Sequence, residues 1–184
     1  MLKPKLLLHS CCGPCSTVCI ERLIESYDVT VFYYNPCIFP EEEYCKRLEE
    51  QKKFLADKQI EIIDPLYDNN SYEELVKGFE LEKEGGERCK ICFKQRLEAT
   101  ATYAKDNGFD YFSTTLTVSP HKNTLIINEI GEKISNELDI KFLSANFKKQ
   151  NGYLRSIELA KEYNLYRQNY CGCRYSIRKV WKIN

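Results

Sequence analysis

The chain alternates short apolar runs with longer stretches in which apolar residues recur at helical spacing. Apolar runs of strand length and helical periodicity predict strands and helices in turn. The predicted strands are Lys5–His9, Val29–Tyr34, Ile60–Ile63, Asp110–Thr114 and Lys141–Ala145. The predicted helices are Pro14–Ser26, Glu41–Lys58, Tyr72–Phe79, Cys89–Asn107, Asn123–Leu138 and Leu154–Glu162. We therefore expect an α/β fold with a five-stranded, mostly parallel sheet flanked by helices.

Length and composition favour one domain. The chain has 184 residues, of which 43% are hydrophobic and 29% are charged, a balance typical of globular proteins. No stretch approaches the roughly 20 apolar residues that cross a bilayer, and the N-terminal apolar run is too short for a signal peptide. We expect one α/β domain over residues 1–184, with residues 164–184 as a basic, aromatic C-terminal extension, and a cytoplasmic location.

Four segments that follow predicted strands are candidates for function, because open parallel sheets bind ligands beyond the carboxyl ends of their strands. These segments read LHSCCGPCS, NPCIFP, DPLYDNN and TTLTVSPHKN. They contain both histidines, His9 and His121, which we expect to be hydrogen-bonded structural residues rather than ligands. Asp64 and Asp68 also lie there; Asp64 is expected to cap a loop, whereas Asp68 could bind iron or deliver a proton.

Ten cysteines are unexpected in a cytoplasmic protein, because a reducing cytosol does not preserve structural disulfides. Metal binding or redox chemistry is therefore favoured. The tetrapeptide Cys12-Gly13-Pro14-Cys15 matches the redox turn of thioredoxins, so one hypothesis is a thiol–disulfide oxidoreductase that uses Cys12 and Cys15. Helical spacing instead favours a core position for Cys15 and especially for Cys19.

Two further cysteine pairs suit metal or redox chemistry. Cys89 and Cys92 open a predicted helix, where two thiolates can bind one metal or cluster. In Cys171-Gly172-Cys173 a disulfide would be strained and easily reduced, which suits a redox pair, although a metal site is the rival use. A third class of function is a zinc-stabilised nucleic-acid binding module, but zinc would use only four of the six paired thiols.

The net charge of zero hides a basic C-terminal segment. Residues 141–184 contain ten Lys or Arg but only two acidic residues. The stretch NLYRQNYCGCRYSIRKVW interleaves aromatic and basic side chains, which can stack on RNA bases and bind phosphates. The alternative is a solvated, salt-bridged surface. The candidate RNA-binding residues are Arg167, Tyr170, Arg174, Arg178 and Lys179.

Five segments in order, LHSCCGPCS, NPCIFP, ERCKICFKQRL, STTLTVSPHKN and YRQNYCGCRYS, together resemble the cobalamin-independent epoxyqueuosine reductases (QueH). The resemblance runs from His9 to Ser176. It implies a fold similar to the adenine nucleotide alpha hydrolases, a Rossmann-like class. It also implies the last step of queuosine biosynthesis, the reductive removal of the epoxide oxygen of epoxyqueuosine at the wobble position of tRNA.

The resemblance further implies a cofactor and an electron source. Cys11, Cys12, Cys89 and Cys92 would hold a 4Fe-4S cluster. Cys171 and Cys173 would form a redox-active pair or help to hold an additional mononuclear iron. The electrons would come from a low-potential donor, and Asp68 is our candidate acid for the leaving oxygen.

One position departs from the family pattern. Cys37 stands in NPCIFP, where the family usually has asparagine or another residue, so we do not expect Cys37 to be an essential ligand. Cys45 is expected to be an ordinary residue of the helix Glu41–Lys58.

Overall fold

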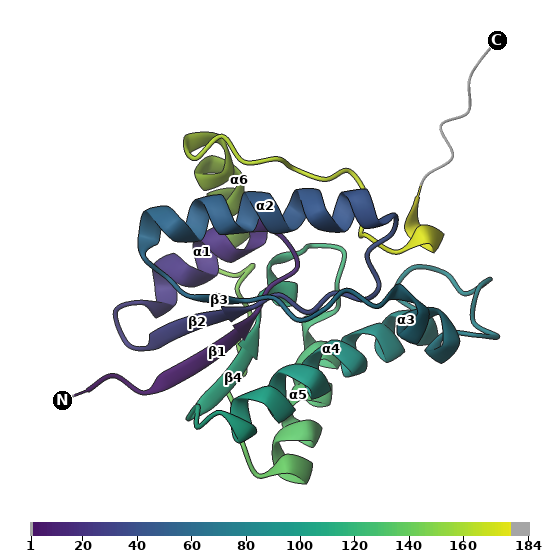
Figure 1. The fold of residues 1–184 in the computed structure, drawn as a ribbon, viewed down its shortest axis with the longest axis horizontal. Helices are drawn as coiled ribbons and strands as arrows, with labels where there is room; N and C mark the ends of the chain where they lie inside the picture. The colour runs from purple at the N-terminus through teal and green to yellow at the C-terminus, as the bar shows by residue number, and fades with distance from the viewer. Residues whose placement is uncertain (1, 178–184) are drawn as a thin grey trace.

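The computed structural model describes residues 2–177, so the predicted RNA-binding residues Arg178 and Lys179 lie outside the described part (Figure 1). The strands are β1 (Lys5–His9), β2 (Asp28–Phe32), β3 (Ile62–Ile63), β4 (Tyr111–Thr114) and β5 (Lys141–Phe142). The α-helices are α1 (Gly13–Leu23), α2 (Glu41–Lys58), α3 (Asn69–Leu75), α4 (Glu87–Asp106), α5 (Thr124–Leu138) and α6 (Gly152–Glu162). Two 3₁₀ turns that the sequence pattern did not predict are η1 (Thr115–Val118) and η2 (Arg174–Ser176).

The five strands form one parallel sheet in the order β3-β2-β1-β4-β5. The chain builds outward from β1 to β3 and then returns to the other side of β1, so strand order reverses between β1 and β4. In such Rossmann-like sheets this switch point opens a crevice at the carboxyl ends of the strands. The prediction of an α/β fold with five parallel strands is confirmed.

Helices cover both faces of the sheet (Figure 1). Helix α1 packs between α2 and α6 on one face, while α4 packs against α5, β1 and β4 on the other. Along β1, Leu6 and Leu8 enter the core beneath α1, whereas Leu7 enters the core beneath α4, and all three are fully buried. Burial on both faces explains why β1 is an uninterrupted apolar run rather than an alternating one.

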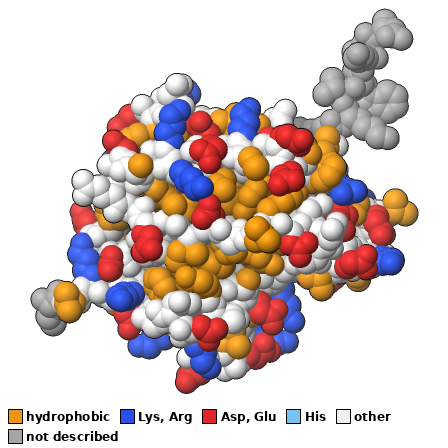
Figure 2. Space-filling view, viewed as in Figure 1, with side chains coloured by type: hydrophobic (Ala, Val, Ile, Leu, Met, Phe, Trp, Pro, Cys, Tyr) orange, Lys and Arg blue, Asp and Glu red, His pale blue; other side chains and the backbone are white. Residues whose placement is uncertain are grey.

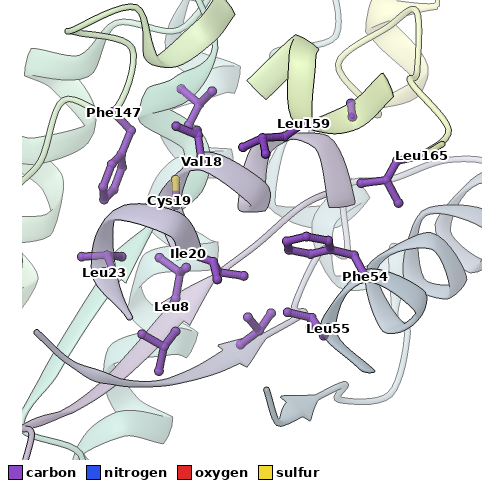
Figure 3. Close-up of a cluster of buried hydrophobic side chains, with 14 of the residues drawn as sticks. Leu8, Val18, Cys19, Ile20, Leu23, Phe54, Leu55, Phe147, Leu159 and Leu165 are labelled. Atoms are coloured by element: carbon purple, nitrogen blue, oxygen red, sulfur yellow. The ribbon is translucent and has the colours of Figure 1, made fainter. Parts of the chain in front are cut away.

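The core beneath α1 joins segments that are far apart in the chain (Figure 3). Leu8, Cys19, Phe54 and Leu159 meet there from β1, α1, α2 and α6. Each such aliphatic or aromatic side chain contributes about 1.5–3 kcal/mol when it is fully buried. The core position predicted for Cys19 is confirmed, since its exposed fraction is 0%.

The edges of the sheet differ from the prediction. Strands β3 and β5 have only two residues each, because an edge strand pairs with one neighbour and regular pairing ends early. Helix α3 begins before the predicted Tyr72, because the Asp68 carboxylate accepts a hydrogen bond from the Ser71 amide at 3.2 Å and caps the helix.

The surface agrees with the mixed composition. On the face shown in Figure 2, basic and acidic side chains are interspersed rather than separated. Cys45 is exposed on α2, as predicted for an ordinary helix residue. None of the helices within residues 2–177 has the length and apolar content that spanning a bilayer requires.

Candidate functional site

The first two cysteines lie directly beyond the carboxyl end of β1. Cys11 and Cys12 are 7% and 1% exposed, and their Sγ atoms are 4.0 Å apart. Cys12 has an extended backbone and lies at the position before the first residue of α1, whose first turn contains Pro14. Proline is favoured there because the first helical amides have no partner within the helix. The local sequence therefore turns the chain from strand to helix with both thiols beside the crevice.

The second pair lies in the first two turns of α4. Cys89 is half-buried and its sulfur accepts a hydrogen bond from the Gly85 amide at 3.2 Å, whereas Cys92 is buried. A spacing of three residues on a helix keeps the two side chains on one face.

The third pair comes from the C-terminal segment, which crosses back over α2. The Arg47 guanidinium donates from Nη1 to the Cys171 carbonyl at 3.1 Å and from Nη2 to the Tyr170 carbonyl at 3.3 Å. The Phe39 amide donates to the Gly172 carbonyl at 2.9 Å. Gly172 has φ +132°, a conformation that residues with a Cβ rarely adopt, so this turn requires glycine.

These segments line two adjoining cavities. The wide cavity, of about 210 Å³, is lined by Cys11, Cys15 and Cys171 together with Lys122 and Arg167. The narrow cavity, of about 30 Å³, is lined by five thiols. They are Cys37, Cys89, Cys92, Cys171 and Cys173. Since Glu84, His121, Lys122 and Cys171 line both, the two cavities form one thiol-rich site.

Two groups of thiols are hydrogen-bonded internally, Cys11 with Cys12 and Cys15, and Cys37 with Cys92. In each group, hydrogen bonding makes one thiol acidic. Hydrogen bonds from Cys12 and Cys15 hold the pKa of Cys11 well below its usual value, while the bond to Cys11 raises the pKa of Cys12 to about 12. Likewise, a hydrogen bond from Cys92 lowers the pKa of Cys37 to about 6. Each group therefore holds one thiol that is easily deprotonated. This suits metal binding, because the thiolate is the form of cysteine that binds a metal.

A cation stands beside these thiols. Lys122 is half-buried and lines both cavities. Burial alone would lower the pKa of Lys122, but attraction to the Cys171 and Cys11 thiols outweighs it and raises that pKa. Lys122 therefore stays charged and favours negative charge at the site.

Five of the six cysteines predicted from the sequence line the two cavities, and the sixth, Cys12, contacts one of the five. Cys11, Cys89, Cys92, Cys171 and Cys173 line the cavities, and Cys12 touches Cys11 and accepts a hydrogen bond from the Gln168 amide at 3.1 Å. Cys15 is half-buried and lines the wide cavity, so it is less enclosed than the core position we expected.

The aspartates lie apart from the thiols. Asp68 is exposed at the start of α3 and lines neither cavity. Asp64 pairs with Lys52 at 2.8 Å, in the loop after β3.

The two histidines have different surroundings. His9 is buried, with its ring nitrogens 3.0 Å from the Thr114 hydroxyl and 3.1 Å from the Tyr34 carbonyl. Burial, and secondarily the nearby Arg96, lowers the pKa of His9 to about 4, so His9 is a neutral structural residue, as expected. His121 is exposed but lines both cavities, which places it at the site.

Three described candidates for RNA binding differ in how far their side chains are already engaged. Arg167 is exposed and lines the wide cavity. Arg174 instead pairs with Glu73 at 3.1 Å, and the Tyr170 hydroxyl donates to the Phe39 carbonyl at 2.6 Å.

Sequence reasoning missed several residues of the site. Lys122 had a positional signal, because it lies in the segment after the fourth predicted strand. Arg47 and Arg96 had none, since an arginine within an amphipathic helix is usually exposed. Cys37 had a signal in its position after the second strand, but nothing local indicated its contact with Cys92.

The chain is similar to known proteins over nearly its whole length. The family model described as "Epoxyqueuosine reductase QueH" matches residues 6–179. A relative of that name from Streptococcus pyogenes serotype M1 is 42% identical over 183 residues, covering 96% of this chain and 72% of the relative. One from Acinetobacter baylyi is 42% identical over 98% of this chain and 84% of the relative. One from Thermotoga maritima is 37% identical over 94% of this chain and 90% of the relative.

Proposed function

The chain belongs to the epoxyqueuosine reductase QueH family, and we propose that it reduces epoxyqueuosine in tRNA to queuosine through an iron–sulfur cluster bound by its own cysteines. The reaction removes the epoxide oxygen with two electrons and two protons and releases water. The observation that supports the cofactor is the meeting of three distant cysteine pairs at the carboxyl end of β1.

The donor set fits such a cluster. Thiolates are the usual ligands of iron–sulfur clusters, and Cys11, Cys12, Cys89 and Cys92 would hold a 4Fe-4S cluster. Within residues 2–177 no three Cys, His, Asp or Glu side chains meet as ligands of a single ion. The thiols instead spread over two cavities, and a four-iron cluster uses one thiolate for each iron. Cys171 and Cys173 remain for a redox pair or an additional iron.

The bound cluster would receive electrons from a donor of low potential and would pass them on one at a time. The residues of the chain would bind the modified base and donate a hydrogen bond to the epoxide oxygen. The modified base would enter the wide cavity, which single-stranded anticodon loops permit because their bases unstack at modest cost. Asp68 lines neither cavity, whereas Lys122 lines both, so we assign to the Lys122 ammonium the hydrogen bond to the epoxide oxygen.

The activity is tested directly by nucleoside analysis. The protein, reconstituted with iron and sulfide without oxygen, is incubated with tRNA that carries epoxyqueuosine and a chemical reductant. Conversion to queuosine in the digested tRNA is the expected result. An intact cluster with no conversion would contradict the activity, and colourless, active protein with stoichiometric zinc would contradict the cofactor.

Arg167 is expected to contact tRNA phosphate, because its exposed guanidinium lines the cavity that would admit the base. We expect Arg167→Gln to weaken tRNA binding several-fold and to lower the slope of log affinity against log salt by about 1, the share of one phosphate contact. The measurement is tRNA affinity at several salt concentrations.

A matched control for Arg167 is available on α6. Arg155→Gln removes an exposed guanidinium that already pairs with Glu21 at 2.8 Å and Glu158 at 3.2 Å, and its salt slope should equal that of the wild type. Equal slopes for all three proteins would show that Arg167 makes no phosphate contact.

A further inference from the structure

Among residues 2–177, three arginines are buried, and two of them have evident structural partners. Arg47 binds Glu43 and the turn at Cys171, as described above. Arg88 donates from Nη1 to the carbonyls of three residues in the loop before α4. These are Phe79, Glu80 and Glu82. Both side chains therefore hold loops in place.

Within the described residues, Arg96 has fewer acceptors than these two: Arg88 also has one unpaired nitrogen, its Nε, but donates to three carbonyls, whereas Arg96 donates to one. It lies one turn after Cys92 in α4, and its exposed fraction is 3%. Its Nε donates to the Cys92 carbonyl at 3.2 Å, but its Nη2 is buried and has no hydrogen-bond partner among the described residues. A buried guanidinium without a counter-charge is strongly disfavoured, so the fold keeps this cation at a cost.

The surroundings of Arg96 indicate the missing partner. Arg96 lines the narrow cavity with its five thiols, and Glu84, the one carboxylate in that lining, is exposed. The cation therefore faces groups that become negative when they bind iron.

We propose that Arg96 is the internal counter-charge of the thiolate-bound cluster and raises its reduction potential. Adding an electron makes the cluster more negative, so a fixed cation nearby stabilises the reduced form more than the oxidised form. Arg96 thus acts on the reaction only through the cluster, by holding a positive charge beside it. This inference rests on the proposed function, because it requires the cluster.

The test compares midpoint potentials of the reconstituted cluster in four proteins: wild type, Arg96→Gln, Arg96→Lys and Lys94→Gln. Arg96→Gln removes the charge but keeps a polar group, whereas Arg96→Lys keeps the charge. Lys94→Gln is the matched control, because Lys94 is exposed on the same helix and water screens its charge.

We expect Arg96→Gln to shift the reduction equilibrium at least tenfold toward the oxidised form, which is about 59 mV for one electron. Arg96→Lys keeps the charge, so its potential should lie much closer to the wild-type value than that of Arg96→Gln. Lys94→Gln should match the wild type. A loaded Arg96→Gln protein with the wild-type potential would overturn the inference while leaving the proposed function intact. A wild-type protein that binds no cluster would overturn the proposed cofactor, and this inference with it.

If Arg96→Gln binds no cluster, the unfolding temperatures of the metal-free wild type and Arg96→Gln test the inference instead. Without the cluster the Arg96 cation has no counter-charge among the described residues and keeps only the hydrogen bond from Nε to the Cys92 carbonyl. Because the glutamine amide also offers a donor, Arg96→Gln should leave the unfolding temperature unchanged or raise it. A lower unfolding temperature would mean that Arg96 serves the fold itself and would overturn the inference.

Discussion

Cys92→Ser is expected to remove the proposed iron–sulfur cluster and with it the reductase activity. Cys92 is buried beside the other thiols, and a serine hydroxyl is a poor ligand for iron because it rarely ionises. Losing a partner that only orients a ligand costs roughly 10–100-fold, so losing a ligand should cost more. The measurement is iron and acid-labile sulfide per chain, together with turnover of epoxyqueuosine.

Two other cysteine variants make this prediction specific. Cys45→Ser is the matched control, because Cys45 is exposed on α2 and should keep full iron content. Cys37→Ser is expected to keep the cluster, even though Cys37 is buried next to Cys92 in the narrow cavity. Iron loss in Cys37→Ser equal to that in Cys92→Ser would make Cys37 a ligand. Full iron in Cys92→Ser would refute the ligand set.

Arg47→Leu is expected to lower the free energy of unfolding by about 3 kcal/mol and to disable the C-terminal cysteine pair. The Arg47 side chain is 1% exposed, and its Nε donates to the Glu43 carboxylate at 2.7 Å. Removing one partner of a buried ion pair costs about 3–5 kcal/mol, and Glu43 remains slightly exposed, which favours the lower end. The measurement is chemical denaturation of the metal-free, reduced protein.

Further variants separate the effect of Arg47 from a general loss of charge. Arg155→Gln breaks an exposed pair and should cost only about 0–1 kcal/mol. Arg47→Lys should fall between the wild type and Arg47→Leu, because a lysine cannot reach Glu43 and both carbonyls of the turn in the geometry of a guanidinium. If Arg47→Leu is as stable and as active as Arg155→Gln, Arg47 does not hold the turn.

Much of the fold followed from local pattern. The apolar run at β1 and the helical periods of α2, α4 and α5 predicted these elements, because burial on one or two faces leaves its period in the sequence. The boundaries of β3, β5 and α3 were less predictable. They depend on one-sided pairing at the edge of a sheet and on a side-chain cap at Asp68, which a hydrophobic pattern does not record.

The sequence likewise predicted some features of the functional site and left others to the tertiary structure. The sequence by itself determined the strand–helix alternation, the placement of Cys11 and Cys12 after β1, and the six paired cysteines, because these depend on residues within a turn or a strand of one another. Only the tertiary structure decided which thiols share a cavity, that Asp68 lies outside it, and that Arg47 holds Cys171, 124 residues away. It also left the Arg96 Nη2 buried with no hydrogen-bond partner among residues 2–177. Such contacts depend on how distant segments pack, and a short stretch of sequence carries no signal of its distant neighbours.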